Sequence, residues 1–425
     1  MTEARSAPAD SPSPAARGPV AAGALAGLRA DAEALAPSLT DLRHRLHRAP
    51  EVGLQLPGTQ ALLREELAGL DLELSEGSSL TSLTGVLRGG ATPSEGPRPV
   101  VLLRADMDAL PVTEEATNGV PLSEHEGRMH ACGHDLHMSG LVGGLRLLHG
   151  RRDRLSVDVV AMFQPGEEGW DGAAHMVAEG VLDAAGRRAD AAFALHVFSG
   201  QALGSVATRP GPLMAASDGV YITVRGRGGH GSAPHTSLDP VPAACEIVLA
   251  LQTALTRSVD PLAAAVITVG VIRAGTKRNV IPDEVELEAT VRTFDPAVRS
   301  VVEALITRVA TGIAAAHGVT ADVRYQAEYP VTVNDGREAS YALEVAAALY
   351  GERAAVRMPQ PITGSEDFSR VLAEVPGAMA FVGACPPGSD PATAPSNHSP
   401  RATFDDAALP MCAALYAGFA LAWQP

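Results

Sequence analysis

The sequence predicts an α/β protein that contains a doubly wound, mostly parallel sheet and a second domain inserted into it. Four short, continuous apolar runs are typical of strands buried on both faces, and helical patterns alternate with them along the chain. Within residues 212–325 the pattern changes to half-exposed strands and two long helices, in the order strand–helix–strand–strand–helix–strand. That order is the ferredoxin-like split arrangement, βαββαβ.

Composition limits what the protein can be. A chain of 425 residues can form two or more cores, because single cores rarely grow beyond about 250–300 residues. The formal net charge of −16 argues against nucleic-acid partners and against anionic membrane surfaces. The longest apolar stretches are too short to span a membrane, so we expect a soluble protein. The four cysteines are widely scattered and do not resemble a disulfide framework, which favours the cytoplasm.

The N-terminal segment is rich in alanine, proline and serine, and we expect it to be a disordered tail. Leucines spaced mostly by three, four or seven residues then predict a helix over 24–48, which Pro50 ends. The predicted divisions of the chain are the tail at 1–19, the first part of the main domain at 20–211, the inserted domain at 212–325 and the second part of the main domain at 326–425.

Each of the four apolar runs is followed closely by side chains that can bind a metal or move a proton. In open α/β sheets, ligands bind beyond the carboxyl ends of the strands, so we expect these side chains to lie near one another. The runs and the residues that follow them are 99–104 with Asp106 and Asp108, 156–163 with Glu167 and Glu168, 190–195 with His196, and 378–383 with His398.

The stretch 129–138 holds one cysteine, three histidines and an aspartate within ten residues. Cys132 and His134 are separated by a single glycine, so in an extended or tight loop both side chains can reach one point. A thiolate and an imidazole together suit zinc, cobalt or nickel. The simpler interpretation is a histidine-rich surface loop, and the metal site therefore needs further ligands from elsewhere. His196 considered alone is more typical of a buried, hydrogen-bonded histidine, and paired glutamates alone are typical of a solvated turn.

The inserted domain carries alternating patterns typical of strands that are exposed on one face, together with two helical patterns that each begin at a proline. The predicted elements are strands at 219–224, 264–272, 285–293 and 319–325, and helices at 241–255 and 296–317.

Nine segments, in order from about residue 40 to the end, resemble the M20 metallopeptidase family. Within it the chain is most similar to the amidohydrolase branch, which includes hippurate hydrolases, N-acyl-amino-acid amidohydrolases and indole-acetyl-amino-acid hydrolases. The segments are RADMDALP (104–111), MHACGHDLHMSG (129–140), FQPGEEG (163–169), ALHV (194–197), GRGGHGSAPH (226–235), NVIPD (279–283), VRTF (291–294), TGSEDF (363–368) and NHSP (397–400).

The resemblance implies a two-metal, exopeptidase-like catalytic domain. Members of the family use manganese, zinc, cobalt or nickel, and the cysteine favours the softer of these metals. Glu167 is implied as the general base, and Asp108 as a residue that orients a ligand without binding metal. The implied ligands of the two divalent ions are Cys132, which takes the place of a bridging aspartate in other branches, His134, Glu168, His196 and His398.

The resemblance also gives roles to three residues of the inserted domain. His230 is implied to stabilise the tetrahedral oxyanion, commonly from the partner subunit, although a histidine in a glycine-rich loop is often just a surface residue. Asn279 and Arg292 are implied to hold the substrate's free α-carboxylate. Taken singly, asparagine suits a turn and arginine suits a solvated strand face. The expected assembly is a homodimer through the inserted lid domain, or a tetramer.

These implications lead to a cytoplasmic, metal-dependent amidohydrolase that splits an N-acyl amino acid into a carboxylic acid and a free amino acid. A dipeptidase or aminoacylase of the same family is the nearest alternative. A metal-containing binding protein without turnover is an alternative of a different class. Metal content, measured together with the release of free amine from a panel of acyl amino acids, distinguishes the enzyme from the binding protein.

Overall fold

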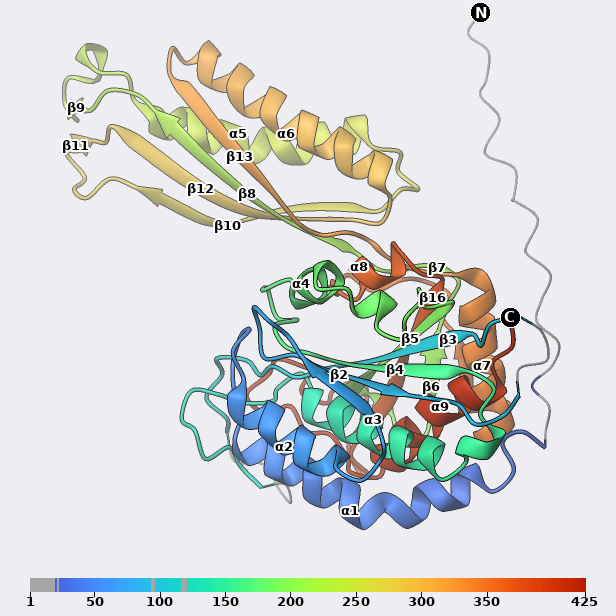
Figure 1. The fold of residues 1–425 in the computed structure, drawn as a ribbon. Helices are drawn as coiled ribbons and strands as arrows, with labels where there is room; N and C mark the ends of the chain where they lie inside the picture. Colours follow the sequence, from blue (N-terminus) through green and yellow to red (C-terminus); the bar gives the residue numbers. More distant parts are fainter. Residues whose placement is uncertain (1–19, 21–22, 93–95, 116–120) are drawn as a thin grey trace, which may run out of the picture. The chain divides into compact units, whose positions relative to one another are not determined.

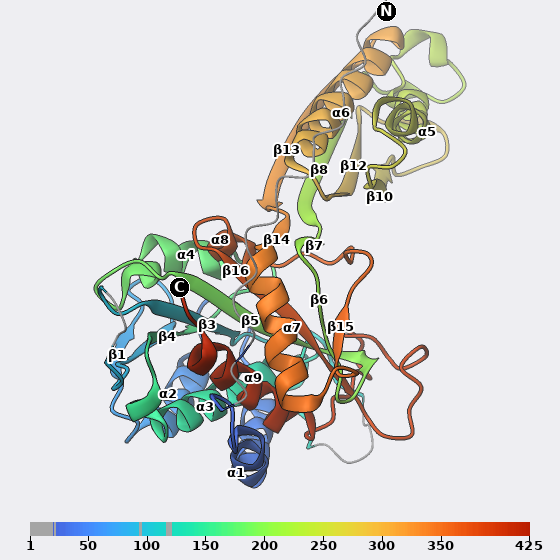
Figure 2. The ribbon, with the colours of Figure 1, turned by 90° about the vertical axis from the view of Figure 1, so that its right-hand side faces the viewer.

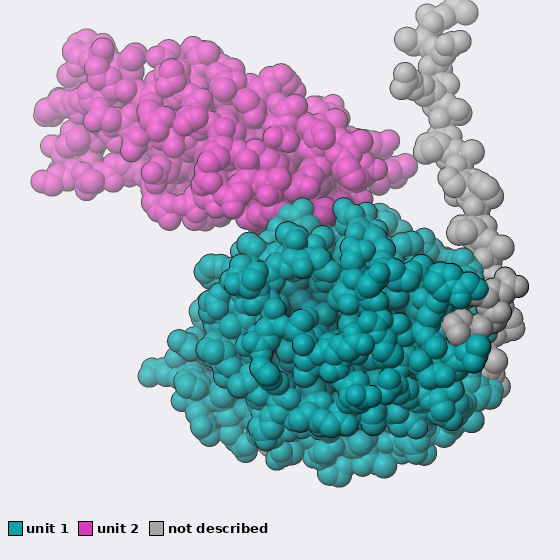
Figure 3. All heavy atoms as spheres, viewed as in Figure 1, with its two compact units in different colours: residues 1–213, 333–360, 370–425 teal, residues 214–332, 361–369 magenta. Residues whose placement is uncertain are grey.

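The computed structural model describes residues 20, 23–92, 96–115 and 121–425, and the chain divides into two units (Figures 1 and 3). Unit 1 comprises residues 1–213, 333–360 and 370–425, and unit 2 comprises 214–332 and 361–369. The predicted disordered tail at 1–19 lies outside the described residues. Of the helices in the described part of the chain, none is both long and apolar enough to cross a membrane.

Unit 1 is built on a mixed, mostly parallel sheet of eight strands in the order β1-β2-β4-β3-β5-β16-β6-β15. The four central strands, β4, β3, β5 and β16, are parallel and buried along most of their length, as their continuous apolar runs predict. The strand bounds are β1 Glu73–Glu76, β2 Leu83–Leu87, β3 Val100–Asp106, β4 Asp158–Gln164, β5 Ala191–Ala202, β6 Val206–Thr208, β15 Ala355–Arg357 and β16 Gly377–Cys385.

Helices α1, α2, α3 and α9 lie on one face of this sheet, and α4 lies on the opposite face (Figures 1 and 2). Glycines allow α3 to approach α9 closely, because a Cβ atom at Gly140 or Gly143 would lie 2.7 Å from a Cβ atom of α9. The helix that carries the histidine-rich motif is thereby fixed against the core. The bounds are α1 Leu28–Arg48, α2 Pro57–Leu67, α3 His134–His149, α4 Gly172–Ala178, α7 Gly336–Tyr350, α8 Ser369–Leu372 and α9 Ala408–Ala422.

Unit 2 contains a four-stranded sheet in the order β10-β12-β8-β13, in which all neighbours are antiparallel, and α5 and α6 pack against it. A two-stranded ribbon, β9 with β11, continues beyond it, and β7 pairs with β14 where the chain enters and leaves the unit. The bounds are β7 Gly211–Met214, β8 Ala216–Arg225, β9 Gly229–His230, α5 Pro240–Ser258, β10 Ala265–Ala274, β11 Val280–Ile281, β12 Glu284–Thr293, α6 Pro296–Ala316, β13 Thr320–Tyr329 and β14 Thr332–Asn334.

The six main elements of unit 2 follow the predicted order, but the boundaries of the unit differ from the predicted 212–325. Unit 2 extends to Thr332, and its last long strand, β13, continues to Tyr329, beyond the predicted end of the strand at 325. It also takes in 361–369, which lies within the predicted second part of the main domain. Backbone pairing joins this segment to the start of the unit, since Met214 pairs with Ile362 and the Ala215 N–H donates to the Gly364 carbonyl.

One strand differs from its prediction in a way that matters for the site. His196 was expected just after a strand ending at residue 195, but β5 continues to Ala202 and His196 lies inside it. The pairing of β3 with β5 ends at Ala194, whereas the pairing of β16 with β5 continues past His196. The imidazole therefore extends from a part of the strand that β3 no longer covers.

Candidate metal centre

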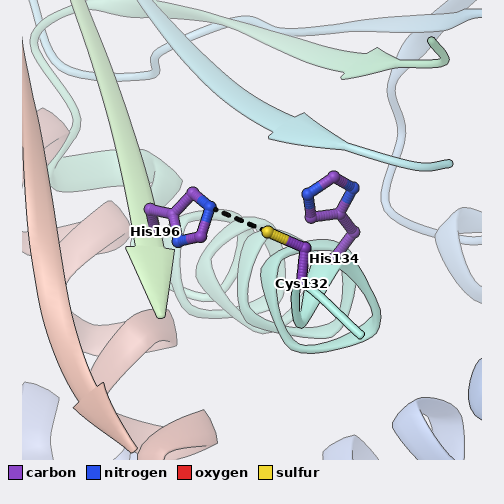
Figure 4. Close-up of side chains that lie close together, drawn as sticks. All are labelled: Cys132, His134 and His196. Carbon is purple, nitrogen blue, oxygen red and sulfur yellow. Dashed lines mark hydrogen bonds between the residues drawn. The ribbon is translucent and has the colours of Figure 1, made fainter. Parts of the chain in front are cut away.

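A glycine turn sets the direction of the first two candidate ligands. Gly133 has φ of 85°, in the left-handed region, and immediately precedes α3, whose first residue is His134. A Cβ atom at Gly133 would lie 2.4 Å from Val197 Cγ2, so a larger residue there would clash with the Val197 side chain. Cys132 and His134 consequently lie on either side of the turn and close to His196 of β5 (Figure 4).

Two histidines present the same ring nitrogen to this site. The Nδ1 atom of His134 lies 2.8 Å from the Asp108 carbonyl oxygen, and the Nδ1 atom of His196 lies 2.9 Å from the Val197 carbonyl oxygen. A carbonyl can only accept, so each Nδ1 carries the proton. The Nε2 atom of His134 is buried and has no hydrogen-bond partner among the described residues, and that of His196 lies 3.4 Å from Cys132 Sγ. This is how ligand histidines are usually held.

The other two candidate ligands lie on the second side of Cys132. His398 Nε2 is 3.2 Å from Cys132 Sγ and 3.1 Å from Glu168 Oε1. His398 has φ of 70°, which is uncommon for a residue other than glycine, and its N–H donates to the Ala131 carbonyl at 2.9 Å. The backbone beside the Cys132 loop thus holds His398 in a conformation of the kind that is common at functional sites.

Cys132 is the common member of two donor groups whose ligand atoms all lie within 4.8 Å of one another. One group is Cys132 with His134 and His196, and the other is Cys132 with Glu168 and His398. Thiolate, imidazole and carboxylate donors suit divalent zinc, cobalt, nickel or manganese. The donor set therefore fits two divalent cations that share the sulfur of Cys132.

Asp108 organises the loop that carries both glutamates. Its carboxylate accepts the backbone N–H of Glu167 at 2.9 Å and that of Glu168 at 3.1 Å. Its carbonyl also accepts the ring proton of His134. A single residue thus fixes two candidate ligands and the candidate base. Glu167 is only 7% exposed, and its carboxylate lies within 4.8 Å of the ligand atoms of His134 and Glu168.

The protonation states of the site favour the binding of a cation. Hydrogen bonds to Cys132 and Glu168 raise the pKa of His398 to about 10. Burial lowers the pKa of His196 well below its usual value, so this imidazole stays neutral, which is its ligand form. Burial opposes ionisation of Glu168, but the hydrogen bond from His398 and the charges of neighbouring histidines lower its pKa overall. A bound cation would therefore take the place of the His398 proton beside Cys132 and Glu168.

Within unit 2, the structure brings His230 and Asn279 together. His230 pairs with Val280 in the β9–β11 ribbon, and the Gly231 N–H donates to the Asn279 carbonyl at 2.9 Å (Figure 1). The Ser232 backbone N–H donates to His230 Nδ1 at 3.2 Å, so this nitrogen carries a lone pair. The neutral ring of the exposed His230 therefore presents Nε2–H, a donor suited to an oxyanion.

Arg292 lies far from these two residues within the same unit. It is at the end of β12, where it donates to Ser217 Oγ and Thr290 Oγ1, both at 2.8 Å. Asn279 precedes the start of β12 at Glu284, and the strand from Glu284 to Arg292 spans roughly 27 Å at about 3.4 Å per residue. Asn279 and Arg292 of one chain therefore cannot hold the same carboxylate, and joint binding requires two copies of the chain.

Two contributors to the site were not identified from the sequence. Asn397 donates its amide to the Cys132 carbonyl at 3.2 Å and to the Val197 carbonyl at 3.0 Å, so it connects the backbone beside three candidate ligands, Cys132, His196 and His398. His137 lies fully buried behind the centre. The motif around Asn397 was visible in the sequence, but nothing in it distinguished this structural role.

A cysteine shared by two cations should be essential for holding them. We expect Cys132→Ser to lose bound metal, because a hydroxyl is a far poorer ligand than a thiolate. The measurement is metal per chain by elemental analysis after loading with zinc and gel filtration. Cys412→Ser is a matched control, since Cys412 is also buried but lies in α9. Two equivalents of zinc in Cys132→Ser would remove Cys132 from the site.

The pattern of Peptidase family M20/M25/M40 matches residues 102–422. Thermostable carboxypeptidase 2 of Saccharolobus solfataricus is 37% identical over 360 residues, which cover 84% of this chain and 88% of that protein. N-acetyl-L-cysteine deacetylase of Bacillus subtilis is 39% identical over 351 residues, which cover 82% of this chain and 81% of that protein. A Bacillus subtilis crystal structure described as a dinuclear metal-binding peptidase from the M20 family has a TM-score of 0.77 and 32% identity, covering 92% of this chain and 98% of that one.

Proposed function

The chain belongs to peptidase family M20/M25/M40 and is a metal-dependent hydrolase acting on amides, and we propose that it cleaves N-acyl amino acids. The products are a carboxylic acid and a free amino acid, and the substrates are hippurate-like, N-acetyl or indole-acetyl conjugates. The observation that carries the proposal is the pair of donor groups sharing Cys132, with the buried Glu167 carboxylate beside them. The amidohydrolase resemblance and the similarity to a deacetylase support the acyl amino acid as substrate.

The proposed chemistry divides between the cations and the protein. Two divalent cations, if bound by these ligands, would polarise the amide carbonyl and make a nearby water more acidic. Glu167 accepts a proton from the attacking water and later delivers it to the leaving nitrogen. Asp108 holds the backbone of Glu167, and the Glu167 carboxylate lies beside the ligand atoms of His134 and Glu168. Metal ions are proposed at two per chain, as manganese, zinc, cobalt or nickel.

A homodimer, or a tetramer built from such dimers, fits the arrangement of unit 2. His230 and Asn279 lie at one end of the unit and Arg292 at the other. If all three act on one substrate, two copies must contribute to each site. We therefore assign His230 and Asn279 to the site of the partner subunit and Arg292 to the site of its own chain.

The four cysteines are free, which supports a cytoplasmic location.

The substrate's carboxylate should be read by Arg292. We expect Arg292→Lys to lower kcat/KM for an N-acyl amino acid by roughly 2–4 kcal/mol of transition-state free energy, the range for breaking a buried charged pair. Lysine keeps the charge but loses the planar fork that fits a carboxylate. The measurement compares the acid with the matching amino-acid amide, for which the change should be small because the amide has no carboxylate. Equal losses on both substrates would mean that Arg292 only holds unit 2 together, through Ser217 and Thr290.

The experiment that tests the function is a hydrolysis screen with defined metals. Hippurate, N-acetyl and indole-acetyl amino acids are compared with unblocked dipeptides and with longer peptides, which a carboxypeptidase would cleave. Release of free amino acid from the N-acyl substrates is expected to dominate. Dominant cleavage of dipeptides would favour a dipeptidase, and cleavage of longer peptides would favour a carboxypeptidase such as the relative from Saccharolobus solfataricus. Bound metal without turnover on any of them would favour the non-catalytic binding protein.

A further inference from the structure

Three fully buried polar side chains form a chain of hydrogen bonds behind the metal centre. Arg104 donates to the Asp106 carboxylate at 2.6 Å, and the other oxygen of Asp106 lies 2.6 Å from His137 Nδ1. Arg104 also donates to Gln164 at 2.8 Å. Buried charges are costly unless they are paired and hydrogen-bonded, so such a network is kept where it has a structural or functional role.

The hydrogen bonds of His137 fix its tautomer and engage both of its ring nitrogens. The backbone N–H of Val197 donates to His137 Nε2 at 2.8 Å, so this nitrogen holds a lone pair. The proton is consequently on Nδ1 and is donated to Asp106. Asp106, His134 and His137 have ligand atoms within 4.8 Å of one another, which resembles a third metal group. Because both ring nitrogens of His137 are engaged, a cation could bind there only by breaking one of these bonds.

His137 accepts the backbone N–H of Val197, the residue of β5 that directly follows the candidate ligand His196. Val197 follows His196, and its carbonyl receives both the His196 ring proton and the Asn397 amide. The Val197 N–H is held by a side chain because the pairing of β3 with β5 has already ended at Ala194. Val197 is therefore fixed by its N–H and by its carbonyl, and its position determines where His196 presents its Nε2 atom.

We propose that His137 is a positioning residue, which holds the backbone of Val197 and thereby aims His196 at the metal centre. Asp106 and Arg104 keep His137 in the tautomer that this requires. The effect of His137 on metal binding rests on the proposed function, whereas its hydrogen bond to the Val197 N–H does not depend on a metal. Sequence position alone would make His137 a ligand as readily as His134, since both lie in the same motif.

Two substitutions separate the two hydrogen bonds of the ring. The amide of asparagine in His137→Asn can occupy the place of Nδ1 and donate to Asp106, but it does not reach Val197. The longer side chain of His137→Gln can place its amide oxygen near the position of Nε2 and accept from Val197. His149→Asn, at the other end of the same helix, is the control for the substitution itself.

Zinc affinity is measured by competition with a chromophoric chelator. We expect the dissociation constant to rise by roughly 10–100-fold in His137→Asn, the usual effect of removing a group that orients a ligand. His137→Gln and His149→Asn should stay within about threefold of the native value, a factor of three being under 1 kcal/mol. The visible spectrum of the cobalt-loaded protein should change in His137→Asn alone. Native affinity in His137→Asn, or equal losses in both His137 variants, would overturn the proposal.

Hydrogen exchange of the metal-free protein provides a test that does not depend on the proposed function. A peptide that contains Val197 should exchange faster in His137→Asn than in native protein, His137→Gln or His149→Asn. Unchanged exchange in His137→Asn would show that His137 does not hold β5. If native protein bound no zinc while exchange changed as expected, the proposed metal function would fail and the holding role would stand. If His137→Asn does not fold, a tenfold loss of zinc affinity in folded His137→Gln overturns the proposal.

Discussion

Glu167→Gln is expected to reduce turnover to background while both metal ions stay bound. A general base contributes about 10²–10⁴-fold to the rate, and glutamine has nearly the same shape but cannot take a proton. Glu167 is buried, and its carboxylate lies beside His134 and Glu168. Its backbone is held by Asp108, so the substitution should leave the loop in place. The measurements are kcat on an N-acyl amino acid and metal per chain on the same preparation.

The neighbouring residue supplies the matched control. Glu168→Gln makes the same chemical change one position along, but Glu168 contacts His398 and belongs to the donor group of Cys132. That variant should lose metal together with activity. If Glu167→Gln lost metal as far as it lost activity, the division of labour between the two glutamates would be wrong. Substantial activity in a fully loaded Glu167→Gln enzyme would require a different base.

The part of the site that could be predicted from the sequence follows from the parallel strands. Apolar runs predicted β3, β4, β5 and β16, and the carboxyl ends of the parallel strands brought the loops after them together, as general principles require. The main element order of unit 2 also followed from periodicity. The predicted end of β5 was wrong because β5 still pairs with β16 after its pairing with β3 has ended. The sequence does not show where a strand loses one of its two partners.

The roles of the individual histidines could not be read from the motif. His134 and His137 lie three residues apart, and both are buried imidazoles near the centre. They differ because the backbone carbonyl of Asp108 leaves His134 Nε2 available, whereas the backbone N–H of Val197 occupies His137 Nε2. Those partners are 26 and 60 positions away in the chain. Tertiary contacts of this kind leave no local signal, and neither does the joining of 361–369 to unit 2.

The adjacency of His230 and Asn279 has the same origin. They are separated by almost fifty residues in the sequence and meet because β9 pairs with β11. The pairing fixes His230 on a ribbon, and Ser232 fixes its tautomer through Nδ1. His230 presents an exposed, oriented Nε2–H donor in unit 2, whereas the five candidate metal ligands lie in unit 1. Its action in the site of a partner subunit is our proposal. This geometry motivates the test of His230.

His230→Ala is expected to lower kcat by about 10²–10³-fold, the usual effect of removing one donor to an oxyanion. Metal content should be unchanged, because the five proposed ligands lie in unit 1 and His230 lies in unit 2. The measurements are kcat and zinc per chain. His317→Ala is the control. His317 is a surface histidine of the same unit that lies at the end of α6 and pairs with Glu246. The control variant should retain native kcat.

Mixed dimers decide whether His230 acts across subunits. A heterodimer of His230→Ala and Glu167→Gln chains, isolated through two different affinity tags, contains one intact His230 and one intact Glu167 on different chains. If each site takes His230 from the partner subunit, one of its two sites is complete, and kcat per dimer should recover to about half of the native value in a two-fold symmetric assembly. If His230 acts within its own chain, both sites lack one group and the heterodimer should stay as inactive as its parents. Inactivity of verified heterodimers would refute the sharing of sites between subunits.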